Sequence, residues 1–509
     1  MERGDWGSAE LDVNAGERGA REPSREREAR AFRVLIAGPF GGRGGAERVP
    51  LAERRVWRVD RDDYDDVLAR VAPTLRLELS PDGSPVALTI RELDDFHPDA
   101  LYDRVPLFRS LRELRARLAD ARTFPAAAAE LLGGGGATSA APAASAAPRP
   151  PRAGHVLDAI LGGPVDEGAD AAEPPADELQ AMIRRIVAPH LVPAADPRQP
   201  ELLAQVDAAI AAQMRALLHH PDFQAVEAMW RALWLLVRRV DTDESLQLHI
   251  VDVSREELMA DLGGAGDITA TGWHRLVVDA AVGTPGAEPW AVVVGAFELG
   301  ATDAELALVA RAMEVARRGG APFIAGAAPR LVGCEAFDRT PDVEQWAAEP
   351  PSGWDEVRAR SDARYAGLVA PRLLLRPPYG KDGDECERFR FEELAGDVRH
   401  ADLLWGSGAL AGALLLAQSF ADMGWAMRPG ARRELGGLPL YFHRAAGEVR
   451  PIPCAEVLLT ERAATRMMER GVMPLASLKD RDAVMMVRFQ SIAAPLGALA
   501  GRWTTAGAE

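Results

Sequence analysis

The chain has 509 residues, 48% of them apolar, and a formal charge of −17 at pH 7. A single hydrophobic core stops growing at about 250–300 residues, so this length predicts at least two domains. The acidic balance disfavours electrostatic capture of nucleic acid or of an anionic membrane face, because both need a basic surface, and it favours protein partners.

The first 132 residues predict a tail followed by a small domain. Residues 1–30 are charged and lack an apolar segment, so they predict a disordered tail and not a secretion signal. Residues 32–37 (FRVLIA) predict a strand that breaks at Gly38 and leads into a glycine-rich loop. LRLEL and VALTI predict two further strands, and residues 107–118 have the apolar spacing of a helix. Residues 31–132 are therefore expected to form an α+β unit.

Residues 133–200 are predicted to be a linker. The segment GGGGATSAAPAASAAPRPPR at 133–152 has too few large apolar residues to pack. Within the linker, HVLDAILGG at 155–163 is an apolar island that predicts a short helix over 155–161. One face of that helix would carry four apolar residues: Val156, Leu157, Ile160 and Leu161.

Residues 201–509 alternate between strand and helix patterns. FQAVEAMWRALWLLVRRV predicts a strong helix, with Phe223 and Trp230 on its apolar face. LQLHIVDV, WAVVVGAFE and PFIAGA predict strands, and ELMADL and DAELALVARAMEVARRGG predict the helices between them. This alternation is typical of an α/β fold with a mixed, partly parallel sheet.

RELDDFHPDALYDRVP, residues 91–106, is the strongest candidate for chemistry. Four potential metal ligands crowd into six positions: Asp94, Asp95, His97 and Asp99. The alternative is structural, because Pro98 biases His97 toward an extended backbone and Phe96 would be buried while the acids cap or approach the next helix. The residues alone leave both readings open and favour the structural one.

Other enzyme signatures are incomplete. The glycine-rich loop lacks a lysine followed by Ser or Thr, and Gly380-Lys381 is followed by Asp382, so no Walker A loop is present. His219 and His220 are adjacent, whereas a ligand pair on a helix needs i,i+4 spacing, so we expect them to shape the start of the helix. The three cysteines form no CxxC pair. No enzyme activity and no cofactor are expected.

The order of motifs resembles the contractile sheath proteins of type VI secretion systems. Residues 32–132, with VDRDDYDDVLARVAP and DDFHPD, resemble the small sheath subunit. Residues 218–495 resemble the large subunit, with SDARYAGLVAPRLLLRPPYG at 361–380 as the most diagnostic segment. The signature residues that carry the resemblance are Asp94, Asp95, Phe96, His97, Pro98, Phe223, Trp230, Arg364, Tyr365, Pro371, Arg372, Pro378, Tyr379, Gly380, Trp405, Gly424 and Trp425.

The resemblance implies a natural fusion of the two subunits in which DDFHPD is structural, without metal or catalysis. It also implies a cytoplasmic protein that assembles into stacked hexameric rings around an inner-tube protein, docks on baseplate components, and neither binds nucleic acid nor inserts into a membrane. A Clp-type AAA+ unfoldase is a further implied partner, and Val156, Leu157, Ile160 and Leu161 lie where its handle would be.

One difference from the family leaves a second function open. Complete large subunits continue beyond the FQSIAAP segment, so residues 201–509 are expected to be a truncated large-subunit domain. The alternative to a sheath subunit is therefore an accessory protein that caps, nucleates or regulates a sheath. An α/β hydrolase is disfavoured.

Overall fold

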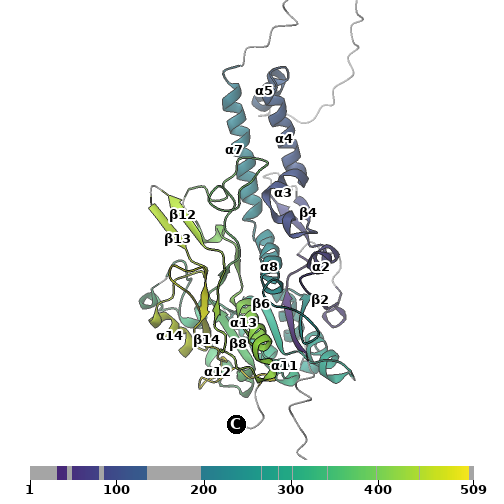
Figure 1. The fold of residues 1–509 in the computed structure, drawn as a ribbon, viewed down its shortest axis with the longest axis vertical. Helices are drawn as coiled ribbons and strands as arrows, with labels where there is room; N and C mark the ends of the chain where they lie inside the picture. Colours follow the sequence, from purple (N-terminus) through teal and green to yellow (C-terminus); the bar gives the residue numbers. More distant parts are fainter. Residues whose placement is uncertain are drawn as a thin grey trace, which may run out of the picture. The chain divides into compact units, whose positions relative to one another are not determined.

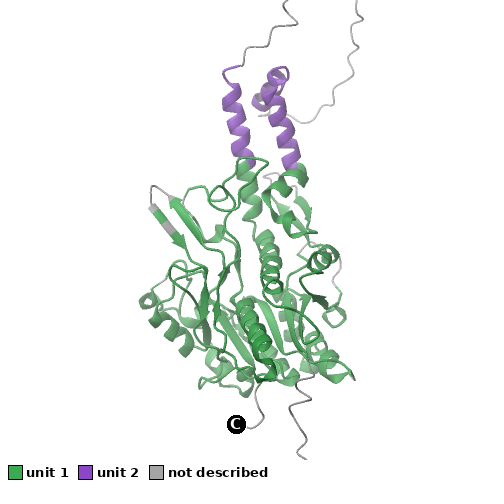
Figure 2. Ribbon diagram, viewed as in Figure 1, with its two compact units in different colours: residues 1–106, 211–509 green, residues 107–210 purple. Residues whose placement is uncertain are grey.

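The structure is a computed structural model that describes residues 31–42, 49–79, 85–133 and 196–503, apart from 265, 285, 301, 341, 397 and 446–447. It divides into two compact units, drawn in green and purple in Figure 2. Unit 1 comprises residues 1–106 and 211–509, and unit 2 comprises residues 107–210. Each unit is described by itself below.

Unit 1 is built on a nine-stranded mixed sheet, so the predicted α/β class is confirmed. The six strands from β14 to β5 run parallel, and the strands outside them are antiparallel. In spatial order the strands are β11 (Glu434–Leu435), β15 (Val484–Met486), β14 (Val472–Ser477), β8 (Ala366–Ala370), β7 (Phe323–Ala327), β6 (Val292–Leu299), β1 (Phe32–Gly38), β5 (Leu246–Asp252) and β2 (Trp57–Val59).

The N-terminal strand β1 lies inside this sheet. Phe32 pairs with Leu246 of β5, and on the other edge of β1 Val34 pairs with Val292 of β6. Residues 31–132 and 201–509, expected to form separate domains, contribute strands to one sheet, and the boundary between compact units falls after residue 106. Local periodicity identifies β1 as a strand but carries no information about its partners.

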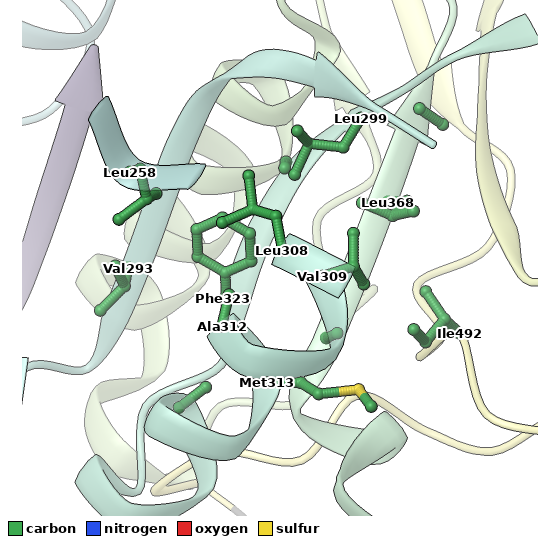
Figure 3. Packing of buried hydrophobic residues seen from close by; sticks show 14 of the residues in the cluster. Leu258, Val293, Leu299, Leu308, Val309, Ala312, Met313, Phe323, Leu368 and Ile492 are labelled. Atoms are coloured by element: carbon green, nitrogen blue, oxygen red, sulfur yellow. The ribbon is translucent and has the colours of Figure 1, made fainter. Parts of the chain in front are cut away.

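Helices cover both faces of the sheet. On one face, α11 (Asp303–Gly319) packs against β6, β7 and β8 together with α9 (Arg255–Gly264), and the close-up in Figure 3 shows Val309 and Met313 of α11 among buried side chains of the sheet. On the other face, α13 (Gly408–Met423) crosses β1, β6, β7 and β8, next to α8 (Pro221–Val237) (Figure 1). Strands covered on both faces need a nearly continuous apolar sequence, and β7 and β8 are buried at every residue.

The start of the chain adds two further pieces to unit 1. Helix α2 (Tyr64–Val71) contacts α8, and the antiparallel pair β3 (Thr74–Glu78) and β4 (Pro85–Thr89) confirms the two predicted strands. They lead through the short 3-10 helix η2 (Leu93–Phe96) to α3 (Pro98–Arg104).

The remaining elements of unit 1 lie nearer the C-terminus. They are α10 (Gly272–His274), the π-helix η5 (Arg275–Gly283), α12 (Trp354–Ala359), α14 (Glu461–Glu469) and the two-stranded pairs β9 (Leu373–Leu374) with β10 (Trp405–Gly406) and β12 (Tyr441–Ala445) with β13 (Glu448–Ile452).

Unit 2 contains α4 (Pro106–Ala119), α5 (Phe124–Gly133) and the first part of α7 (Gln199–Leu218). An ion pair between Arg115 and Asp207 (2.5 Å) and a hydrogen bond from the Gln199 amide to the Leu118 carbonyl (2.7 Å) join α4 to α7. The sequence analysis predicted α4 but neither α5 nor α7. Both are rich in alanine, so the contrast between an apolar and a polar face is weak.

Candidate functional site: a buried junction

The same tripeptide, His-Pro-Asp, starts two helices of unit 1. In α3, Nδ1 of His97 accepts a hydrogen bond from the backbone N–H of Asp99 (3.2 Å), and in α8 His220 accepts the equivalent bond from Asp222 (3.2 Å). Each proline occupies a first-turn position, where a missing N–H costs nothing. The prediction that His220 shapes the start of a helix is confirmed.

Of the two roles predicted for the acids of the DDFHPD motif, capping the next helix or approaching it, Asp95 takes the second by pairing with Arg104 of α3. Asp95 is 3% exposed, accepts hydrogen bonds from the backbone N–H groups of Arg91 and Glu92, and forms an ion pair with Arg104. Asp94 is exposed in η2. Asp95 therefore fixes the turn before α3, and the cap itself comes from His97.

The DDFHPD motif packs against the large-subunit-like part of the chain. The His97 ring meets the Tyr379 ring edge to face at a centroid distance of 4.9 Å, and Phe96 meets Phe223 in the same geometry at 5.6 Å. Asp99 accepts hydrogen bonds from the backbone N–H groups of Glu387 (2.9 Å) and Arg388 (3.0 Å). Signature residues far apart in the sequence thus meet at one place.

Behind this contact lies a group of three charged side chains that we call the buried ion cluster: Glu227 of α8, Arg376 and Glu393. The Arg376 guanidinium donates through Nε to Glu227 (2.7 Å) and through Nη1 to Glu393 (2.7 Å). Each of the three side chains is at most 7% exposed. Two carboxylates held by one guanidinium connect α8 to the segment that follows β9.

Neighbouring groups satisfy the remaining hydrogen-bonding capacity of the cluster. Arg231 donates to Glu227 (2.7 Å) and to the Tyr379 hydroxyl (2.7 Å), and the Tyr379 backbone N–H donates to Glu393 (2.7 Å). Gly380, at φ +138°, allows the turn that brings Glu393 back to Tyr379, because a Cβ there would collide with the Glu392 carboxylate.

The buried ion cluster is held in its charged form. Burial alone would raise the pKa of Glu393, but the charge of Arg376 and the neighbouring His219 and Tyr379 N–H lower that pKa to about 2. Burial alone would lower the pKa of Arg376, but Glu227 and Glu393 raise it well above its usual value. Such a cluster specifies how the segments meet, since removing one member leaves an unpaired buried charge.

Arg372 forms a second ion pair at the end of β8. Its guanidinium donates to Glu456 through Nε (3.1 Å) and Nη2 (2.6 Å), and His400 Nε2 lies 3.1 Å from the same carboxylate. Burial would raise the pKa of Glu456, but His400 and Arg372 lower it to about 2.

We expect Glu456→Gln to flatten the acid limb of the stability curve. A carboxylate whose folded pKa is about 2 and whose unfolded pKa is about 4.3 stabilises the fold above pH ~4.3, and that stabilisation disappears as the pH falls toward 2. The term is worth up to about 3 kcal/mol. Urea unfolding between pH 5 and pH 2.5 should show a smaller loss for Glu456→Gln than for the wild type. Exposed Glu344→Gln is the control, and parallel curves for all three proteins would refute the assignment.

The other signature residues occupy structural positions in unit 1. Trp425 packs against Phe32 of β1 (5.7 Å between centroids) and against Phe420, next to Gly424 in a left-handed conformation. Trp405 stacks on His400 and donates to its carbonyl (2.9 Å). The remaining positions are Arg364 and Tyr365 in the 3-10 helix before β8, Pro371 after a cis peptide bond, and Pro98, Pro378 and Trp230 in buried or partly buried packing.

Two observations bear on possible chemistry in the described part of the chain. No three His, Cys, Asp or Glu side chains in the described ranges lie close enough to hold a metal ion. Burial and the nearby Asp99 raise the pKa of the Cys386 thiol to about 12, so this thiol is protonated at neutral pH and is a poor nucleophile. The arrangement at the junction is suited to holding segments together.

Two of the predicted segments cannot be compared with the structure. The predicted tail at 1–30 and the predicted helix at 155–161, with Val156, Leu157, Ile160 and Leu161, lie outside the described residues. Within the described ranges, no helix is both long and apolar enough to cross a membrane.

The signature residues are recognisable from sequence, whereas the buried ion cluster was not predicted. One signal was present: Glu227 lies four residues after Phe223 and three before Trp230, on the apolar face of the predicted helix. A buried carboxylate at such a position needs a cationic partner, because an unpaired buried charge is costly. Arg376 and Glu393, which complete the cluster, carry no comparable local signal.

Both parts of the chain match families of known proteins. Residues 200–493 match the VipB family model, described as a tail sheath N-terminal domain, and residues 20–129 match the family model of the type VI secretion system protein VipA. The type VI secretion system sheath protein TssC1 of Pseudomonas aeruginosa is 29% identical over 307 residues, which cover 58% of this chain and 61% of that relative. The chain thus spans less than two thirds of the relative's length.

Proposed function

Because this chain belongs to the sheath protein family of type VI secretion systems, with small- and large-subunit sequences in one polypeptide, we propose that it is a structural subunit of a contractile sheath. The observation that carries the proposal is the position of β1 between β5 and β6. The small-subunit-like segment supplies a central strand to the sheet of the large-subunit-like segment, so the two act as one building block.

In the proposed assembly, the function lies in surfaces and not in catalytic residues. Copies of the chain form hexameric rings that stack in the cytoplasm around an inner-tube protein and begin at baseplate components. Energy is stored in an extended packing of the rings and released as they rotate into a tighter one, without a nucleotide during firing. The buried ion cluster supports this role, because a subunit that moves as a body needs segments that do not slip against each other.

Negative-stain electron microscopy of the purified chain, alone and mixed with the inner-tube protein of the same bacterium, tests the proposal. Hollow tubes with a cogwheel cross-section are the expected result. Discrete particles in both samples would overturn the role as a self-sufficient subunit and favour an accessory protein that caps, nucleates or regulates a sheath.

We further propose that the segment 155–161 is a handle for a Clp-type AAA+ unfoldase that recycles contracted sheaths. Its apolar residues Val156, Leu157, Ile160 and Leu161 would enter a groove on the partner as one helix face. Leu157→Asp should abolish co-purification with the unfoldase and leave the circular dichroism spectrum unchanged. Asp158→Asn is the matched control, and equal binding by Leu157→Asp and the wild type would rule out the handle.

A further inference from the structure

A pocket of about 400 Å³ opens beside the buried ion cluster in unit 1. It is lined by the last turn of α8, by the segment after β9 and by residues 437–439 before β12. Four of its five charged lining residues are cationic, although the chain as a whole is strongly acidic: Arg231, Arg238, Arg239, Arg376 and Asp384.

The four arginines of the pocket differ in their partners. Arg231 and Arg376 are engaged by Glu227 and Glu393, as described above. Among the described residues, no carboxylate lies within ion-pair distance of Arg238 or Arg239. The Arg238 guanidinium lies 5.7 Å from the centre of the Trp234 ring, and Arg239 donates to the backbone carbonyls of Gly436 and Gly437.

Burial and neighbouring charges change the pKa of Arg239. Burial lowers the pKa of Arg239 and the charge of Arg238 lowers it further, whereas the charge of Asp482 partly opposes both effects. Asp384 is 65% exposed, and its carboxylate lies 3.9 Å from Nε2 of His97. Arg238 and Arg239 therefore border the pocket without a carboxylate at ion-pair distance among the described residues.

The end of α8 accounts for only part of this arrangement. A helix C-terminus carries a partial negative charge of about half an electron and favours one nearby cation. Arg238 at the C-cap can serve that purpose, which leaves Arg239 beside it without a carboxylate at ion-pair distance among the described residues. At about 30 Å³ for each water molecule, the volume of the pocket corresponds to about a dozen waters, so a small anion can enter it.

We infer that this pocket is an oxyanion site, in which Arg238 and Arg239 bind the oxygens of a phosphate or of a carboxylate. Guanidinium groups present several donors in one plane, which matches the paired oxygens of both anions. The anion is either free phosphate or a carboxylate side chain from a second copy of this chain. The first source is independent of the proposed sheath function, and the second rests on it.

Equilibrium dialysis of the full-length chain against radiolabelled inorganic phosphate, at constant ionic strength, tests the free anion. We expect saturable binding of one phosphate per chain, weakened about tenfold by Arg238→Gln because a charge-assisted hydrogen bond is lost. Arg238→Lys should bind with intermediate affinity, since the charge stays and the fork is lost. Exposed Arg109→Gln is the control. Equal weakening by Arg238→Gln and Arg109→Gln would overturn the site.

Sedimentation velocity tests the second source. If phosphate does not bind but Arg238→Glu lowers self-association at least tenfold more than Arg109→Glu, the pocket takes a carboxylate from a second copy. If phosphate does not bind and the two variants associate alike, the inference is wrong while the sheath proposal stands. If the wild-type chain does not associate at all, the sheath proposal fails, and the phosphate measurement alone decides the pocket.

Discussion

Replacing Arg376 with leucine should lower the free energy of unfolding by about 3–5 kcal/mol, because it leaves the buried carboxylates of Glu227 and Glu393 without their shared cation. Both carboxylates are almost fully shielded from water, so solvent offers them little compensation. Chemical denaturation followed by tryptophan fluorescence measures the loss.

Two further variants sharpen the Arg376 experiment. Arg198→Leu removes an arginine of the same size from an exposed ion pair with Asp196 and should cost much less. The triple variant Glu227→Leu, Arg376→Leu, Glu393→Leu removes all three charges and should recover part of the lost stability. A loss below about 1 kcal/mol for Arg376→Leu would show that the cluster does not hold the junction.

Trp230→Ala should cost about 3–5 kcal/mol, as expected for deleting a fully buried aromatic side chain. The indole meets the rings of Phe40 and Tyr64 edge to face, at 5.3 Å and 5.8 Å, and donates a hydrogen bond to the Phe40 carbonyl (3.0 Å). Phe40 and Tyr64 belong to the small-subunit-like segment, so the substitution also removes contacts across the junction.

The matched control is Trp234→Ala, one turn later in α8. Trp234 is only partly buried, so its loss leaves a smaller cavity, and the midpoint of urea unfolding should move less than for Trp230→Ala. An unchanged midpoint for Trp230→Ala would contradict the packing of α8 described here.

Local patterns in the sequence predicted most of the elements that carry strong periodicity. The apolar runs of β6 and β7 and the apolar face of α8 appear where they were expected, since burial on one or both faces imposes a period on the residues themselves. The alanine-rich helices α5 and α7 were missed for the opposite reason, because small residues give almost no contrast between faces.

The meeting of distant segments could not be predicted in the same way. The sequence of residues 32–38 does not predict that β1 pairs with β5 and β6, because buried parallel strands in general have similarly apolar sequences. The buried ion cluster has the same limitation: Glu227, Arg376 and Glu393 become partners only once the chain is folded. The resemblance of motifs supplied the signature residues at the junction, but neither the members of the buried ion cluster nor the contacts between them.

The covalent connection between β1 and the rest of its sheet has a consequence for assembly. If the strand came from a separate polypeptide, the fraction of complete sheets would fall on dilution. Here the link makes strand insertion intramolecular, so the strand and its sheet meet at an effective concentration that dilution does not change. Completion of the sheet should therefore be independent of protein concentration, and each chain receives one central strand without any need to balance the synthesis of two partners.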